Sequence, residues 1–156
     1  MAGRALAGLL SSVDKRWQRF RFRSRLSIDL DWKGPLAWFV GDTYCVTRAL
    51  LLTITASKHE EFVLARGIFE VQPLADRRWL PAAELSEFLT LPVIIPSNRE
   101  WGERIYGPSL AKGLRGFLHP QARTFLRLTV YDLHGARLRS KPVELTILEL
   151  EREEHR

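Results

Sequence analysis

The stretch at the centre of the chain, residues 46–71, consists of two apolar runs divided by a polar tetrad at residues 57–60. Both runs are rich in Val, Ile, Leu, Phe and Thr, which suit a pleated, half-buried surface. In the first run the apolar residues share one parity, and hence one face of a strand, with Arg48 as the exception. These residues are Val46, Leu50, Leu52, Ile54 and Ala56. The pattern predicts two strands in the core of a small all-β domain.

A second pattern, from residue 17 to residue 32, alternates with a period of two, which is typical of a half-buried strand. The apolar even positions are Phe20, Phe22, Leu26, Ile28, Leu30 and Trp32. The charged odd positions are Arg19, Arg21, Arg23, Arg25, Asp29 and Asp31. Gly34 and Pro35 follow and favour a turn, so we predict a strand that ends before them.

Shorter signals follow. Apolar residues between 88 and 95 predict a strand, and because Pro92 removes a ladder donor, this strand belongs at a sheet edge or carries a bulge. Ser109 is a suitable N-cap for a short helix over residues 109–117. The apolar stripe of that helix is Leu110, Leu114 and Phe117.

The chain closes with a hairpin pattern. Apolar and polar residues alternate over residues 126–131, and the turn that follows contains Gly135 where a positive φ is favoured. We predict a return strand over residues 137–148 and polar, non-strand residues after it.

About seven short strands with turn signals between them, and at most one short helix, predict an all-β fold. We expect an antiparallel, immunoglobulin-like β-sandwich, with a small antiparallel β-barrel as the alternative. In an immunoglobulin-like arrangement the link at Lys58 and His59 crosses between sheets instead of closing a hairpin. The expected organisation is a flexible N-terminal arm at residues 1–16, the sandwich at 17–149 and a polar C-terminal tail at 150–156.

Two segments together resemble an immunoglobulin-like β-sandwich family of bacterial proteins of unknown function. Residues 50–69, LLLTITASKHEEFVLARGIF, are similar to that family's strand, polar break and strand with a Gly-aromatic ending. Residues 123–145, RTFLRLTVYDLHGARLRSKPVEL, are similar to its closing hairpin, with Asp-x-x-Gly in the turn. The break at residues 57–59 lacks the Asn-x-Gly expected there. The resemblance implies a fold and no catalytic residues.

The composition is that of a globular protein and argues against a disulfide-stabilised or membrane-spanning one. The 156 residues are 46% hydrophobic and 27% charged, which are ordinary values for a globular protein. A single cysteine, Cys45, excludes an internal disulfide, and no apolar run approaches the roughly 20 residues of a membrane helix. We therefore expect a cytoplasmic protein without a membrane partner. Of the net charge of +6, most comes from residues 1–35, which hold eight basic and three acidic side chains.

Motifs for catalysis are missing from the sequence. The four histidines have no metal-ligand spacing, and there is no phosphate-binding glycine loop or nucleophile elbow. Cys45 precedes an apolar strand and is interpreted as a buried small hydrophobe. We predict a protein that is not an enzyme and binds no metal or cofactor.

The candidate binding residues are arginines and aromatic residues. Alternate residues on a strand lie about 6.6–6.8 Å apart, so Arg19, Arg21, Arg23 and Arg25 present a regular row of guanidinium groups, which bind phosphate or carboxylate. The closing hairpin adds Arg123, Arg127, Tyr131, Arg137 and Arg139. Trp79 and Trp101 are expected in loops, where they are candidates for contact with a ligand.

These features favour a non-catalytic interaction module that binds a protein partner through a basic edge and loops. The alternative function is a nucleic-acid-binding module that uses the arginines at residues 19–25. A third interpretation is that charges on an edge strand only prevent aggregation. A homodimer formed through an unpaired strand is also compatible with the pattern.

Overall fold

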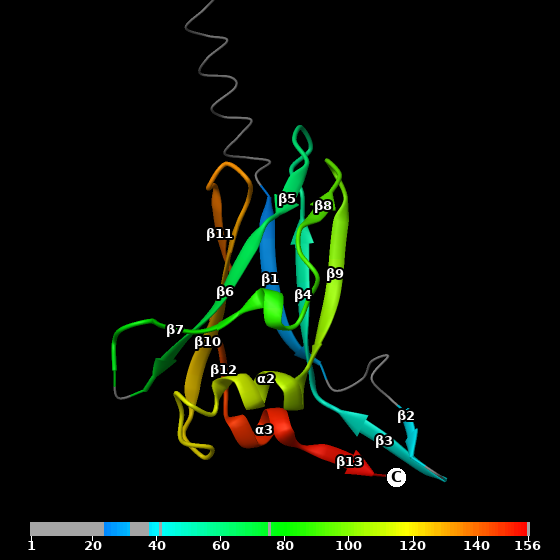
Figure 1. The fold of residues 1–156 in the computed structure, drawn as a ribbon, viewed down its shortest axis with the longest axis vertical. Coiled ribbons are helices and arrows are strands. Elements are labelled where there is room, and N and C mark those ends of the chain that lie inside the picture. The colour runs from blue at the N-terminus through cyan, green and yellow to red at the C-terminus, as the bar shows by residue number, and fades with distance from the viewer. Residues whose placement is uncertain (1–23, 32–37, 41, 75, 156) are drawn as a thin grey trace, which may run out of the picture.

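A computed structural model describes residues 24–31, 38–40, 42–74 and 76–155, which form a mostly antiparallel β structure (Figure 1). The first sheet contains β1 (Arg25–Asp31), β4 (Ala49–Thr55) and β9 (Glu100–Tyr106), in the order β1-β4-β9. The strand predicted over residues 17–32 is therefore described from Arg25 to Asp31. Arg19, Arg21 and Arg23 lie outside the described residues.

The second sheet has the order β11-β10-β6-β7. Its members are β6 (Arg66–Pro73), β7 (Leu80–Glu84), β10 (Thr124–Tyr131) and β11 (Arg137–Arg139), and β12 (Val143–Leu145) also pairs with β10. At its centre β6 and β10 pair over eight residues, from Arg66 opposite Tyr131 to Pro73 opposite Thr124. All the pairs in this sheet are antiparallel.

Two smaller sheets and three short helices complete the described fold. One small sheet consists of β2 (Trp38–Val40), β3 (Thr43–Thr47) and β13 (Glu153–His155), and the other of β5 (Phe62–Leu64) and β8 (Val93–Ile95). The helices are the 3-10 turn η1 (Leu85–Glu87), α2 (Gly107–Leu114) and α3 (Ile147–Glu151). Among these residues no helix has the length and apolar character needed to cross a bilayer. The described sheets remain open, so the alternative of a closed barrel is not formed by them.

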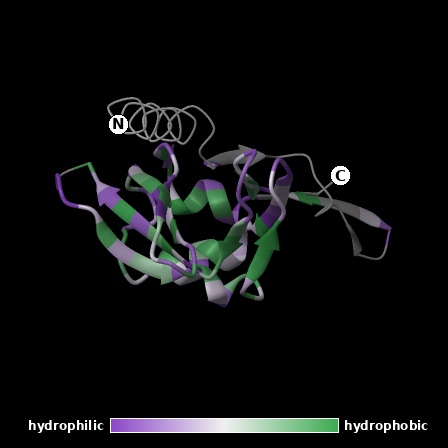
Figure 2. Cartoon of the chain, turned by 90° about the horizontal axis from the view of Figure 1, so that it is seen from above, coloured by the Kyte–Doolittle hydropathy of each residue, from purple (hydrophilic) through white to green (hydrophobic). Residues whose placement is uncertain are grey.

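The core lies between the two larger sheets. Leu50, Leu52 and Ile54 of β4 are buried in one cluster with the apolar residues of β6 and β10. Figure 2 shows hydrophobic positions alternating with hydrophilic ones along the strands. The predicted face of the central strand is confirmed for its buried members, Leu50, Leu52, Ile54 and Ala56. Val46 lies instead in β3 and is half-buried.

Residues 56–61 link β4 to β5 of the small β5–β8 sheet, and the chain then enters β6 of the second sheet, so β4 and β6 belong to different sheets. The polar tetrad therefore does not close a hairpin between the two apolar runs. Of the strand predicted over residues 88–95 with Pro92 inside it, only β8 forms, which begins one residue after this proline and pairs with β5 alone among the described strands.

The C-terminal region differs from the prediction. The return strand is split into β11 and β12 around residues 140–142, where Ser140 is buried and Pro142 has no N–H to donate. Residues 147–155, predicted as the end of that strand and a polar tail, form α3 and β13. Thr146 and Glu149 form a capping box at the start of α3, and this local signal explains why a helix begins there.

The predicted short helix corresponds to α2, which begins two residues earlier than expected. Tyr106 takes the N-cap position instead of Ser109, because Pro108 fits the first turn of a helix. Leu110 and Leu114 are buried as predicted, whereas Phe117 lies beyond the helix and is 49% exposed.

Gly107 is the point of closest approach between α2, the β3–β4 junction and α3. Its N–H donates to the Arg48 carbonyl at 2.8 Å. A Cβ at this position would lie 2.5 Å from the carbonyl oxygens of both Arg48 and Leu150, and neither can move without displacing backbone.

We expect Gly107→Ala to lower the free energy of unfolding by about 1–3 kcal/mol, the usual cost of overpacking. Gly116→Ala is the control, since a Cβ there meets nothing within 4 Å. Urea denaturation of both variants measures the difference. Equal stabilities of the two variants would contradict the close approach.

Candidate binding surface

The outer face of the second sheet carries most of the arginines predicted from the closing hairpin. Leu126, Leu128 and Val130 of β10 point into the core, so the residues between them point outward. Tyr131 lies between Arg66 of β6 and Arg137 of β11, and Thr129 lies between Ile68 and Arg139. The sheet thus brings Arg127, Tyr131, Arg137 and Arg139 to one face.

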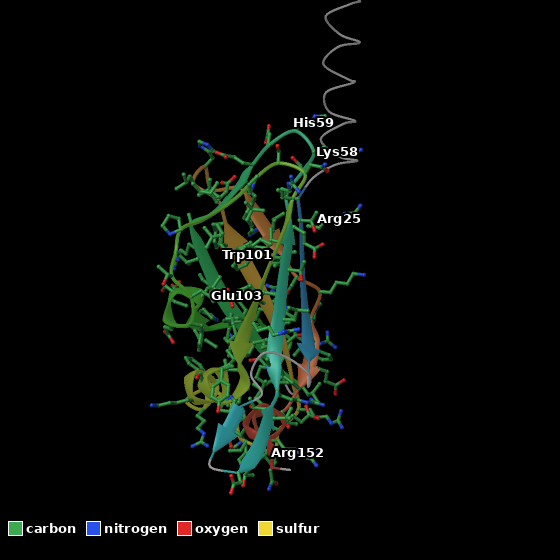
Figure 3. All side chains as sticks on the ribbon, turned by 90° about the vertical axis from the view of Figure 1, so that its right-hand side faces the viewer. Arg25, Lys58, His59, Trp101, Glu103 and Arg152 are labelled. Atoms are coloured by element: carbon green, nitrogen blue, oxygen red, sulfur yellow. The ribbon has the colours of Figure 1, made fainter. Side chains whose placement is uncertain are left out.

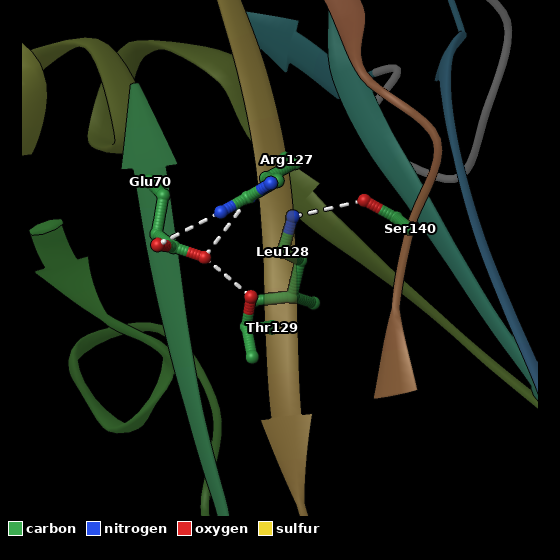
Figure 4. Close-up of polar contacts among 5 residues, drawn as sticks. All are labelled: Glu70, Arg127, Leu128, Thr129 and Ser140. Carbon is green, nitrogen blue, oxygen red and sulfur yellow. Dashed lines mark hydrogen bonds and ion pairs between the residues drawn. The ribbon is translucent and has the colours of Figure 1, made fainter. Parts of the chain in front are cut away.

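Arg127 is held in a polar cluster at the centre of this face (Figure 4). Its Nε and Nη2 donate to Glu70 Oε1 and Oε2 at 3.1 and 3.3 Å, and Thr129 Oγ1 donates to the same carboxylate. The Arg127 guanidinium also stacks over the Trp79 ring, 4.1 Å from its centroid. Both side chains of the ion pair are largely buried, with 16% and 17% of their surfaces exposed. Through Trp79 and Glu70, Arg127 therefore connects the loop that precedes β7 to β6.

The pKa of Glu70 reports this environment. Burial raises the pKa of the carboxyl, but the hydrogen bonds from Arg127 and Thr129, together with the charges of Arg127 and Arg139, outweigh burial and hold the pKa below its usual range. Glu70 was not singled out from the sequence. The signal that points to it is its register opposite Arg127, which only the strand pairing reveals.

Two other arginines of this region are paired at the surface. Arg66 Nη2 lies 2.7 Å from Glu84 Oε1, and Arg123 Nη1 lies 3.2 Å from Glu144 Oε1. Both pairs are well exposed to solvent, so each contributes little to stability. The charge of Arg123 is therefore balanced by Glu144 of β12.

Arg137 and Arg139 differ from these three arginines. Both are exposed on β11, and neither forms an ion pair with a described residue. Their alternate positions place them about 6.6–6.8 Å apart. The exposed Lys141 follows them directly in the chain. This strand thus carries positive charge that forms no ion pair with a described residue, although the charge of Arg139 also acts on Glu70.

Strand β1 packs beside β11 and β12, and the exposed Arg25 stands at its first position. We define the basic edge as Arg25, Arg137 and Arg139. The structure therefore places the strand that carries Arg25 next to the strand that carries Arg137 and Arg139, with Arg25 on the outward face of the first sheet and the other two on the outward face of the second.

The loops at the start of β1 are tied together by hydrogen bonds. Ser57 N–H donates to Ser24 Oγ at 3.1 Å, and Asn98 N–H donates to the Ser57 carbonyl at 2.7 Å. In the neighbouring turn, Asp132 Oδ1 accepts from the N–H groups of His134 and Ala136, and Gly135 has the predicted positive φ. Figure 3 shows the exposed Lys58 and His59 at the same end as Arg25.

The two tryptophans proposed for ligand contact have different positions. Trp79 lies just before β7, as expected for a connection, and covers Arg127. The expectation of a loop is wrong for Trp101, which lies in β9 opposite Ile54 and packs against the core. The strand was missed because Trp101 is followed by Gly102, Glu103 and Arg104, a polar run that hides its apolar face.

No group of three metal-ligating side chains lies together within the ranges that the structure describes. A surface depression is lined by Pro108, Lys112, Arg115 and Glu151. Two of these lining residues, Arg115 and Glu151, form an ion pair with an Nε–Oε1 distance of 2.6 Å. The pair joins the end of α2 to α3.

No family model and no curated protein matches the chain. Among solved structures, the chain is similar to target SoR45 of the Northeast Structural Genomics Consortium, at 9% identity and a TM-score of 0.40, over 79% of this chain and 86% of that one. It is also similar to the sporulation control protein Spo0M of Bacillus subtilis, at 8% identity and a TM-score of 0.40, over 78% and 49% of the two chains. Pectate lyase PelI of Erwinia chrysanthemi, at 9% identity and a TM-score of 0.35, is matched over 77% and 28%. At these TM-scores the similarities carry no argument about function.

The Glu70 cluster predicts a pH-dependent contribution to stability. We expect Glu70→Gln to lower the free energy of unfolding by about 1–3 kcal/mol at neutral pH, because the buried Arg127 loses its carboxylate partner. Because the folded-state pKa of Glu70 lies below the unfolded value of about 4.3, the contribution is complete above that pH and is lost as the pH falls through the folded pKa.

Urea denaturation of the parent protein and of Glu70→Gln between neutral and acidic pH tests this expectation. The exposed Arg66–Glu84 pair supplies the control Glu84→Gln, expected to change stability by no more than about 0.5 kcal/mol. A Glu70→Gln difference that stays constant down to acidic pH would refute the role of the carboxylate charge.

Proposed function

We propose that the chain is an immunoglobulin-like sandwich that acts as a non-catalytic interaction module. It binds an acidic protein partner through the basic edge and the adjoining loops. The immunoglobulin-like strand arrangement and the binding of an acidic partner are supported by separate observations.

The strand order supports the immunoglobulin-like assignment. With β1, β4, β6, β7, β9, β10 and β11 read as strands A, B, C, C′, E, F and G, the sheets have the orders A-B-E and G-F-C-C′. Immunoglobulin-like sandwiches pair strands A, B and E in one sheet and G, F and C in the other, and C′ adds next to C. Residues 56–65, which contain β5, are then the B–C connection between the sheets.

The observation that carries the binding proposal is the contrast among the arginines of the second sheet. Arg66, Arg123 and Arg127 each have a glutamate partner, whereas Arg137 and Arg139 have none among the described residues. A side chain that is already paired must lose its partner before it binds another carboxylate. Arg137 and Arg139 carry no such cost, so they are the groups that suit an acidic surface.

The loops next to the basic edge support the same location. In immunoglobulin-like domains the B–C and F–G connections lie at one end, where many of them bind partners. Here the B–C connection begins with residues 56–61 and the F–G connection is residues 132–136, and hydrogen bonds within each of these loops restrict their motion. An ordered loop loses less conformational entropy on binding than a disordered one.

The test uses a fluorescently labelled extended peptide with glutamates at alternate positions and a labelled single-stranded RNA, at physiological salt. We expect the peptide to bind the full chain and to bind Arg137→Ser/Arg139→Ser about threefold to tenfold more weakly, because each exposed ion pair contributes up to about 1 kcal/mol. Arg78→Ser removes an arginine from the β6–β7 connection, far along the sheet from β11, and is the matched control.

Two results would overturn the proposal. If the RNA binds more tightly than the peptide and its affinity falls steeply with salt, the module recognises nucleic acid. If Arg78→Ser weakens peptide binding as much as the double variant does, the attraction comes from net charge and not from the basic edge.

A further inference from the structure

Strand β9 is the edge of the first sheet in the described structure. It pairs with β4 over seven residues, from Ala49 opposite Tyr106 to Thr55 opposite Glu100, and no described strand pairs with its other side. A long edge of this kind presents unpaired N–H and C=O groups to another chain, and proteins usually protect such edges.

Glu103 is a charged residue at a core-facing position of this edge. Leu52 and Ile54 are buried, and their cross-strand partners on β9 are Glu103 and Trp101, so both of these point to the core side of the sheet. Trp101 is half-buried, whereas Glu103 remains exposed because nothing described lies beyond the edge (Figure 3). A strand added to β9 must therefore place a residue next to this carboxylate.

The carboxylate determines which strands the edge accepts. An added strand with an apolar residue opposite Glu103 would bury an uncompensated charge, which costs several kcal/mol. A strand with an arginine at that position would form a charge-assisted pair instead. The edge thus rejects most extended chains and admits one with a suitably placed basic residue.

Gly102 gives the same edge a second requirement. A Cβ at this position would meet only the Leu52 carbonyl, at an ordinary 3.5 Å, so packing in the described structure does not demand glycine. Glycine in an edge strand leaves a gap on the outer face, and an aromatic residue on a neighbouring strand fills such a gap well. The best partner therefore alternates arginine and aromatic residues.

Residues 19–23, Arg-Phe-Arg-Phe-Arg, have this alternation. We propose that this segment of a second copy of the chain adds to β9 as an antiparallel strand, with Arg21 opposite Glu103. The antiparallel direction is the more stable pairing and the one used throughout the described sheets.

This register satisfies both requirements at once. With Arg21 opposite Glu103, Phe22 lies opposite Gly102 and Arg23 lies opposite Trp101, where its guanidinium can stack on the ring. The register shifted by one residue places Phe next to Glu103 and an arginine next to Arg104, so it both buries the carboxylate unpaired and brings like charges together.

The segment must come from a second copy because its own chain is too short to reach. Adjacent strands in a sheet lie about 4.8 Å apart. In the order β1-β4-β9, a strand added beyond β9 is three spacings from β1, a distance of about 14 Å. Arg23 precedes Arg25, the first residue of β1, by only two positions, which span at most about 7 Å. Exchange of the segments between two copies forms a symmetric dimer.

The first test is a charge reversal followed by sedimentation of the full chain. We expect the parent protein to sediment as a dimer, Glu103→Arg and Arg21→Glu to sediment as monomers, and the double variant Arg21→Glu/Glu103→Arg to recover the dimer. Glu60→Arg, an equal change of charge in an exposed loop, is the control and should remain dimeric. Arg21→Glu lies outside β9, so it tests the pairing even if Glu103→Arg impairs folding.

A monomeric parent protein, or a double variant that stays monomeric while folded, would overturn the proposal. The dimer is independent of the binding function proposed above, since Arg137→Ser/Arg139→Ser should weaken the peptide complex and leave the dimer intact. Loss of the dimer in that double variant would count against β9 as the interface.

The register has a test of its own in a Cys45→Ala background, which removes the only native cysteine. Copies with Phe22→Cys mixed with copies with Gly102→Cys should form a disulfide-linked dimer under mild oxidation, because directly opposite residues have Cβ atoms about 4.5–5.5 Å apart. Phe20→Cys mixed with Gly102→Cys is the control, two residues out of register. Equal cross-linking of the two mixtures would refute the register.

Discussion

The pairing of β6 with β10 is the interaction on which the rest of the structure depends. Over eight residues it places Phe69, Val71, Leu126 and Leu128 on the core side and Glu70 and Arg127 on the outer side. A shift by one residue would expose the apolar set and bury the charged one, so the register is strongly specified. The Glu70–Arg127 pair reinforces it, because the two charges meet only in the observed alignment.

The charges of the protein are divided between those that form ion pairs within the fold and those that the proposed binding uses. Arg127 is clamped between a carboxylate and an indole ring, and Arg115 joins two helices through Glu151. Arg137 and Arg139 on β11 form no ion pair with a described residue. At the far edge, Glu103 limits which strands pair with β9. Paired charges lie in the middle of the second sheet, and charges without an ion pair among the described residues lie at the sheet edges. Different residues therefore contribute to stability and to the proposed recognition.

Much of the candidate site followed from alternation alone. The period-two pattern over residues 126–131 predicted that Arg127 and Tyr131 lie opposite the face of Leu126, Leu128 and Val130, and only the strand pairing adds Arg137 and Arg139 to their face. The pattern did not predict that Arg127 is already paired with Glu70, because Glu70 lies 57 residues away in the chain. Trp101 was misplaced for a similar reason: its burial comes from Ile54 across the sheet and not from its polar neighbours. A partner brought by tertiary pairing leaves no local signal.

The sequence by itself determined the central and closing strands, the faces that they bury and the turn at Gly135, because side-chain parity and backbone preference are local properties. Only the tertiary structure decided where strands end and which strands meet. β4 ends at Thr55 where the chain crosses to the second sheet, and the C-terminal residues form α3 and β13 although their polarity predicted a tail. In both cases the free energy of a segment depends on the surface or strand that it meets, and that partner is distant in sequence.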